Sequence, residues 1–175
     1  ISHMPTDFKL TQTLGELIAT PSISSADAKL DTSNRAVVEL LANWLSDLNF
    51  SVEIQELGGD KVNLIANRGS GSNGLVLSGH TDTVPCDEDQ WDSNPFAVSD
   101  RDNRFFGLGT TDMKGFFAIV LEALKDFDSV EFQHPLTILA TADEESSMSG
   151  ARALSSNQFN ARYAVIGEPT GLKPI

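Results

Sequence analysis

The sequence predicts an α/β domain whose sheet is mixed but mainly parallel and is flanked by helices. Three observations support this prediction. Strand-like and helix-like segments alternate along the chain. Residues 75–77 and 136–140 are short, continuous apolar runs, typical of buried parallel strands. Residues 116–127 carry apolar side chains at helical spacing between these runs, as a right-handed crossover between parallel strands requires.

Two amphipathic helices are predicted before the first buried strand. Residues 8–19 place leucine and isoleucine at the i, i+4, i+7 and i+8 positions of one helical face. A second helix, with a broader apolar face, runs from Val37 to Leu48. The capping residues expected are Thr6 or Asp7 for the first helix, Thr32 or Ser33 for the second, and Asn49 at its end.

The remaining elements are short. Residues 51–57 alternate apolar and polar side chains, so they form a half-buried strand whose antiparallel partner is residues 62–67. Between residues 83 and 111 we expect no helix. The other predicted elements are a surface hairpin of 96–99 with 104–107, a short helix at 150–157 and a last strand at 163–167.

Composition narrows the function classes. The formal net charge of −13 argues against a nucleic-acid partner and against anionic membranes, which both need clustered basic residues. Apolar runs long enough to span a membrane are not found, and the single cysteine allows no internal disulfide, so a cytoplasmic location is expected. Residues 1–4 are typical of a cloning remnant, which leaves 5–175 as the domain.

Acidic residues and one histidine follow the ends of the predicted parallel strands. Because ligands bind at the carboxyl ends of strands in open α/β sheets, we expect these residues to converge on one edge. His80 and Asp82 lie two residues apart in an extended segment, so their side chains can meet and the carboxylate can fix the ring. The converging residues are His80, Asp82, Asp112, Asp143, Glu144, Glu145 and Glu168.

This set predicts a metal site. Clustered carboxylates would repel one another without a cation, and a histidine nitrogen with carboxylate oxygens suits zinc, with cobalt or manganese as alternatives. Asp112 can bridge two ions through its two oxygens, as in two-metal hydrolases. Neighbours on an extended segment point opposite ways, so one of Glu144 and Glu145 should bind metal and the other act as general base.

Four motifs carry a family resemblance that covers about residues 6–175. The chain resembles the dinuclear zinc aminoacylase/carboxypeptidase-G-like metallohydrolases, whose catalytic domain is zinc-peptidase-like. The motifs are Ser-Gly-His-Thr-Asp-Thr-Val-Pro (78–85), Gly-Leu-Gly-Thr-Thr-Asp-Met-Lys-Gly (107–115), Ala-Asp-Glu-Glu (142–145) and Gly-Glu-Pro-Thr (167–170).

The resemblance implies a role for each matching residue. Two divalent ions would be held by His80 and Glu168 on one side and Glu145 on the other, with Asp112 bridging. Zinc is the expected metal for both ions, and cobalt is the alternative. Asp82 would orient His80, and Glu144 would be the general base. A cis peptide bond is also expected after the bridging residue, at Asp112-Met113.

The implied reaction is hydrolysis of N2-acetyl-L-ornithine in arginine biosynthesis, a small N-acylated amino acid substrate. The alternatives are desuccinylation of succinyl-diaminopimelate, another aminoacylase or peptidase activity of the family, and a non-catalytic metal-binding module. The family's second ion is completed by a histidine near the C-terminus of a chain about twice this long. Neither His3 nor His134 fits that role, so the chain is expected to be truncated, without the lid and homodimerisation domain, and inactive alone.

Overall fold

The computed structural model describes residues 9–155, 158–171 and 173 of the 175-residue chain. It contains a five-stranded sheet in the order β1-β2-β6-β3-β7, a separate two-stranded hairpin, β4-β5, and an isolated parallel bridge between Ile23 and Thr83. The helices and strands, in chain order, are α1 (Leu10–Ile18), α2 (Arg35–Asp47), β1 (Ser51–Gly58), β2 (Lys61–Arg68), β3 (Gly74–His80), β4 (Ser99–Arg101), β5 (Arg104–Phe106), α3 (Lys114–Leu124), β6 (Leu136–Thr141), α4 (Ser149–Arg152) and β7 (Ala161–Ile166).

The sheet is mixed, as predicted. Strands β3, β6 and β7 run parallel to one another, β2 pairs antiparallel with β6, and β1 pairs antiparallel with β2. The register places His80 opposite Thr141, and Ser78 opposite Ile166. The carboxyl ends of the three parallel strands therefore lie at the same edge of the sheet, which is the edge that the sequence predicted for the site.

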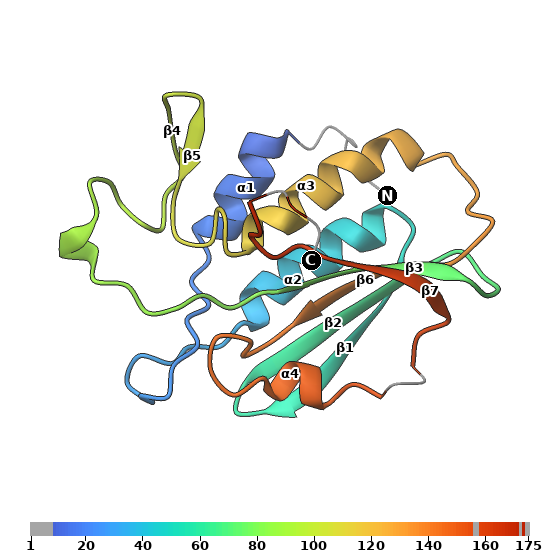
Figure 1. Ribbon diagram of the computed structural model, residues 1–175, viewed down its shortest axis with the longest axis horizontal. Helices are drawn as coiled ribbons and strands as arrows, with labels where there is room; N and C mark the ends of the chain where they lie inside the picture. The colour runs from blue at the N-terminus through green and yellow to red at the C-terminus, as the bar shows by residue number, and fades with distance from the viewer. Residues whose placement is uncertain (1–8, 156–157, 172, 174–175) are drawn as a thin grey trace.

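Helices α1, α2 and α3 lie together on one side of the sheet (Figure 1). The apolar face predicted for α2 is buried, and the main hydrophobic core joins it to the inner side chains of β2 and β6. Phe117 of α3, only 1% exposed, lies in this core. A smaller cluster of Ile65, Val76 and Leu139 occupies the other face of the sheet. Most of the apolar burial that stabilises the fold therefore lies between the sheet and the three helices.

The helix caps differ from those expected. Helix α1 begins after Lys9, and Thr6, Asp7 and residues 1–4 lie outside the described residues. The N-cap of α2 is Asn34 rather than Thr32 or Ser33, although Ser33 Oγ accepts a 3.1 Å hydrogen bond from Arg35 N. The side chain of Asn34 bonds instead to the backbone of Val62 in β2, at 3.0 and 2.8 Å. At the other end the C-cap is Leu48, and Asn49, expected at the end of this helix, follows it with a positive φ of 64°.

Several boundaries also shift. The helix expected at 116–127 is α3, which begins earlier and continues as a 3-10 turn at Lys125–Phe127. Another 3-10 turn, Glu88–Gln90, lies where no helix was expected. The short helix expected at 150–157 is α4, which ends at Arg152, and positions 156–157 lie outside the described residues. Within the described part of the chain, no helix is both long and apolar enough to cross a membrane.

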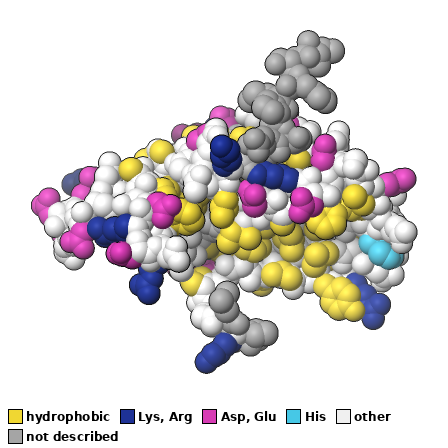
Figure 2. All heavy atoms as spheres, turned by 90° about the horizontal axis from the view of Figure 1, so that it is seen from above, with side chains coloured by type: hydrophobic (Ala, Val, Ile, Leu, Met, Phe, Trp, Pro, Cys, Tyr) yellow, Lys and Arg dark blue, Asp and Glu magenta, His cyan; other side chains and the backbone are white. Residues whose placement is uncertain are grey.

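Strand β7 forms one edge of the sheet, and its side chains are exposed. Tyr163, Val165 and Ile166 are 61%, 48% and 64% exposed, and Ile119 on the neighbouring surface of α3 is 60% exposed. Figure 2 shows a broad patch of hydrophobic side chains on the visible face of the molecule, and most charged side chains on that face lie outside the patch. Part of the sheet and of α3 thus presents an apolar surface to solvent.

Candidate metal centre

His80, the last residue of β3, is the centre of the predicted site. Its side chain is 1% exposed, and its Nε2 atom lies 3.1 Å from Asp112 Oδ1. On the other side of the ring, Nδ1 lies 2.9 Å from the backbone oxygen of Asp82 and 3.5 Å from Asp82 Oδ1. With Nδ1 turned to Asp82, the ring directs Nε2 toward the acidic residues.

Asp82 has a second role that sequence reasoning missed. Its side chain is fully buried, and its two oxygens accept hydrogen bonds from the backbone N–H groups of Glu144 and Glu145, at 3.2 and 3.1 Å. One carboxylate therefore contacts both the histidine and the turn that carries two of the predicted acidic residues.

Asp112 and Glu168 approach His80 from two other segments. Asp112 lies in the loop before α3, and Glu168 follows β7, where its Oε1 atom lies 3.8 Å from His80 Nε2. Their side chains are 50% and 37% exposed, so both carboxylates also face solvent. The Asp112-Met113 peptide bond is cis, as the resemblance implied.

Glu144 and Glu145 do not lie on an extended segment, and that part of the sequence reasoning was wrong. Asp143, just before them, has a φ of 57°, and residues 144–147 form a turn. As a result both glutamates reach the same side: each has a carboxylate oxygen in a group with His80 whose ligand atoms lie within 4.8 Å of one another. Glu144 Oε2 is 4.0 Å from His80 Nε2.

The charges of these groups are strongly coupled. Burial alone would lower the pKa of His80, but the hydrogen bond and charge of Asp82, together with the charge of Glu168, raise it to about 9. Burial raises the pKa of Glu145 and of Glu168, and the neighbouring charge of Asp112 adds to both shifts. The repulsion expected from the sequence is therefore present, and protonation of His80 or a bound cation relieves it.

The donor set fits a divalent metal ion. The described residues contain two groups of three potential ligands whose atoms lie within 4.8 Å of one another: His80, Asp112 and Glu168, and His80, Glu144 and Glu145. One imidazole nitrogen with several carboxylate oxygens is a common ligand set for zinc. The two groups share His80, so they describe one continuous cluster.

Asp143 lies outside this cluster, although the sequence placed it at the same edge. Its carboxylate contacts Lys61 Nζ at 3.0 Å and accepts hydrogen bonds from Ser149 Oγ at 2.6 Å and Ser24 Oγ at 3.1 Å. Burial would raise the pKa of Asp143, but these donors and the charge of Lys61 lower it. Lys61 and Ser24 carry no local signal of this role, since they lie far from Asp143 in the sequence.

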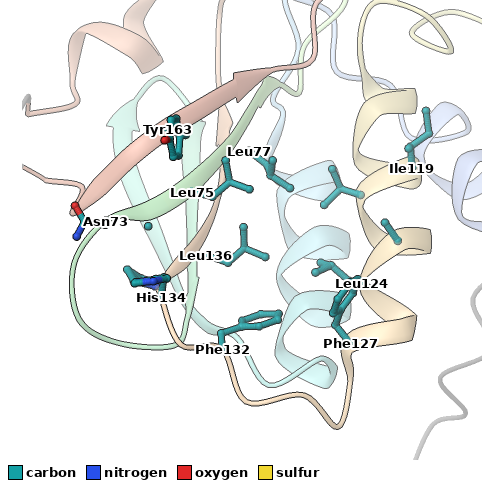
Figure 3. Close-up of a pocket in the computed structure, with 14 residues that line it drawn as sticks. Asn73, Leu75, Leu77, Ile119, Leu124, Phe127, Phe132, His134, Leu136 and Tyr163 are labelled. Carbon is teal, nitrogen blue, oxygen red and sulfur yellow. The ribbon is translucent and has the colours of Figure 1, made fainter.

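Two hollows lie at opposite ends of the parallel strands. One, of about 540 Å³, is bordered by Asp112 and Glu145 and walled by Trp91, Phe106 and Leu108, so it opens beside the metal cluster. A larger apolar cavity, of about 600 Å³, lies at the opposite ends of the strands between β3, β6 and α3 (Figure 3). His134 lines this second cavity, with its Nδ1 atom 3.0 Å from Ser72 O, so it lies away from the cluster, as expected.

Comparison with known sequences gives consistent matches. The profile of peptidase family M20/M25/M40 matches residues 76–175. Acetylornithine deacetylase of Proteus mirabilis (strain HI4320) is 56% identical over 164 residues, which are 91% of this chain and 42% of that protein. Acetylornithine deacetylase of Salmonella paratyphi B is 53% identical over 162 residues, with the same shares. The chain thus spans less than half the length of the curated relatives it matches.

Solved structures share the fold. Human carnosine dipeptidase 1 superposes with a TM-score of 0.78 at 22% identity, over 90% of this chain and 38% of that one. The M20 family metallo-carboxypeptidase Sso-CP2 from Sulfolobus solfataricus gives a TM-score of 0.73 at 19% identity, over 91% and 37%. At these identities the likeness shows the fold, a mixed sheet flanked by helices.

Proposed function

The chain belongs to peptidase family M20/M25/M40, and we propose that it supplies the metal centre of an enzyme that hydrolyses N2-acetyl-L-ornithine to L-ornithine and acetate. The observation that carries the proposal is the convergence of five side chains at the carboxyl-end edge of the sheet: His80, Asp112, Glu144, Glu145 and Glu168. The names of the curated relatives support the acetylated substrate, and with it a role in arginine biosynthesis.

The proposed centre holds two divalent ions of the same kind, zinc by preference and cobalt as the alternative. His80, Asp112 and Glu168 would hold one ion, and these three form one of the two ligand groups. Asp112 would also contact the second ion, with Glu145. The other ligand group contains Glu145 but joins it to His80 and Glu144 rather than to Asp112. When bound, such ions polarise an acyl carbonyl and lower the pKa of a water molecule.

The residues of the chain perform the proton transfers and the positioning. Asp82 holds Nδ1 of His80, so that Nε2 remains available as a ligand. Glu144, whose side chain is 40% exposed, can accept the proton of the attacking water as the new C–O bond forms. It then delivers that proton to the departing amine nitrogen as the amide C–N bond breaks. A pure binding module has no need of this spare base.

The space beside the cluster suits a small acylated amino acid. The hollow of about 540 Å³ is bordered by Asp112 and Glu145, so a ligand in it would contact the proposed metal ligands. Its aromatic wall, from Trp91 and Phe106, can exclude water from the amide.

The activity of the whole enzyme is proposed to need more than these residues. The chain covers 42% of the length of its curated relatives. By the resemblance, the remaining ligand of the second ion is a histidine, and we expect it, together with the lid and a homodimer interface, to come from outside the 175 residues.

The variant Glu144→Gln tests the proposal in an enzyme that has the relatives' full length and carries these 175 residues. The amide keeps the shape of the side chain but cannot accept the proton, so kcat should fall by about 100-fold to 10,000-fold while metal content is unchanged. Glu53→Gln on the exposed strand β1 is the matched control and should change neither quantity. Unaltered kcat in Glu144→Gln would refute the assignment of Glu144 as the base, whereas a wild-type protein that binds metal without hydrolysing the substrate would favour a binding module.

A further inference from the structure

The turn that carries Glu144 and Glu145 is held from two sides by two buried carboxylates. On one side, Asp82 accepts hydrogen bonds from the backbone N–H groups of both glutamates. On the other side, Asp143 anchors the turn through its own side chain and through its backbone oxygen, which accepts from Met148 N at 2.6 Å. The directions of both glutamates therefore depend on the placement of these two carboxylates.

The side chain of Asp143 is fixed by donors from three separate parts of the chain. Lys61 Nζ at the start of β2 lies 3.0 Å away, Ser24 Oγ lies 3.1 Å away, and Ser149 Oγ of α4 lies 2.6 Å away. Lys61 is 6% exposed, and Ser24 is 2% exposed. A buried carboxylate that loses such donors keeps its desolvation cost, so each donor strongly favours the observed position.

Segment 22–24 also connects this anchor to the strand end that carries the histidine. Ser22 Oγ donates to the backbone oxygen of Thr81 at 2.6 Å. The backbone pairs in the same place, because Thr83 N donates to Ser22 O at 3.0 Å and Ser24 N donates to Thr83 O at 2.9 Å. One short segment thus contacts both the loop after His80 and the carboxylate that anchors the glutamate turn.

We propose that Ser24 and Lys61 are positioning residues: they hold the Asp143 carboxylate, and through it the Glu144–Glu145 turn, against the loop that follows His80. Neither belongs to the two ligand groups, so they act through Asp143, and Ser24 also through its 2.5 Å hydrogen bond with Ser146 Oγ in the turn, rather than by touching a metal ion or substrate. The consequence for metal binding rests on the proposed function. The positioning itself is a property of the metal-free chain.

Amide hydrogen exchange in the metal-free chain tests the positioning directly. The N–H groups of Glu144 and Glu145 are protected by their bonds to Asp82, so loosening of the turn should appear as faster exchange at these two amides. Ser24→Ala and Lys61→Met should each accelerate exchange there by about 10-fold or more, while the amide of Leu64 in the core of β2 is unchanged. Ser25→Ala is the matched control, because among the described residues Ser25 Oγ accepts from Asp27 N within its own loop, away from Asp143.

Cobalt binding tests the consequence, measured in an enzyme of the relatives' full length that carries the same substitutions. Residues that support metal ligands change affinity by about 10-fold to 100-fold when removed, so both variants should weaken Co²⁺ binding by such a factor and alter its visible absorption spectrum. Lys61→Arg keeps the charge and the donors and should restore most of the affinity. Ser24→Ala removes only one hydroxyl, so it remains informative if Lys61→Met fails to fold.

Two results would overturn the inference. The first is exchange at Glu144 and Glu145 that matches the wild type. The second is equal acceleration at Leu64, which would mark a general loss of stability. If an enzyme of the relatives' full length that carries these residues binds no cobalt, the proposed function fails, and the exchange rates of the chain still decide whether Ser24 and Lys61 position the turn.

Discussion

The protonation of His80 gives a quantitative test of the site. In the metal-free protein the pKa of this imidazole is raised from 6.5 to about 9, against the lowering effect of burial, chiefly by Asp82. That difference corresponds to about 3 kcal/mol in favour of the protonated ring, since one pKa unit is about 1.36 kcal/mol. The perturbation is Asp82→Asn, which removes the negative charge beside Nδ1. The lowering effect of burial is then less opposed, and the pKa of His80 should fall clearly below its wild-type value.

The same difference makes stability depend on pH. Because the pKa of His80 is higher in the folded state, its contribution is complete below about pH 6.5 and is lost as the pH rises through about 9. The metal-free protein should therefore lose about 3 kcal/mol of unfolding free energy from this group across that range. In Asp82→Asn most of that loss should disappear. Asp82→Asn should also be less stable than the wild type at every pH. Its side-chain NH2 replaces one of the two carboxylate oxygens that accept hydrogen bonds from the backbone N–H groups of Glu144 and Glu145.

The assay combines NMR titration of the imidazole with urea unfolding at several pH values, after removal of metal with a chelator. Glu168→Gln serves as a graded control, since it removes a smaller contribution and should lower the pKa of His80 by less than Asp82→Asn does. A wild-type His80 that titrates below pH 7 would refute the reasoning. So would an Asp82→Asn variant whose His80 keeps the wild-type pKa.

Further predictions concern the packing around the site, each measured by urea unfolding. Burial lowers the pKa of Lys114 to about 8, so the unfolding free energy should rise between about pH 8 and 10.5, and Lys114→Met should abolish that rise. Gly150→Ala should cost about 1–3 kcal/mol, because the new Cβ would lie 2.5 Å from the backbone of Ala142, whereas Gly15→Ala, with nothing within 4 Å, should add about 0.5–1 kcal/mol. Phe117→Ala should cost about 3–5 kcal/mol, and a loss below 1 kcal/mol would contradict its place in the core.

Much of the architecture could be predicted because local patterns determine it. Continuous apolar runs marked β3 and β6 as buried strands, and the helical spacing between them required a crossover. Once the strands are parallel, their carboxyl ends must share an edge, so the meeting of His80 with Asp112 and Glu168 follows from topology.

The glutamate turn could not be predicted in the same way. A strand end followed by acidic residues gives no sign that Asp143 adopts a left-handed conformation, and this conformation brings Glu144 and Glu145 to the same side. Its anchor depends on Lys61, 82 positions earlier (143 − 61), and such a contact has no local sequence pattern. Asn34 illustrates the same limit, because its side chain forms hydrogen bonds with the backbone of Val62 instead of capping its own helix.

The most direct test of the central claim uses an enzyme of the relatives' full length that carries these 175 residues. With zinc or cobalt supplied, release of the acyl group is followed from N2-acetyl-L-ornithine and N-succinyl-diaminopimelate side by side. The proposal predicts a strong preference for the acetylated substrate, with activity that requires the metal and is lost in Glu144→Gln. Metal bound at the site without hydrolysis of either substrate would contradict it.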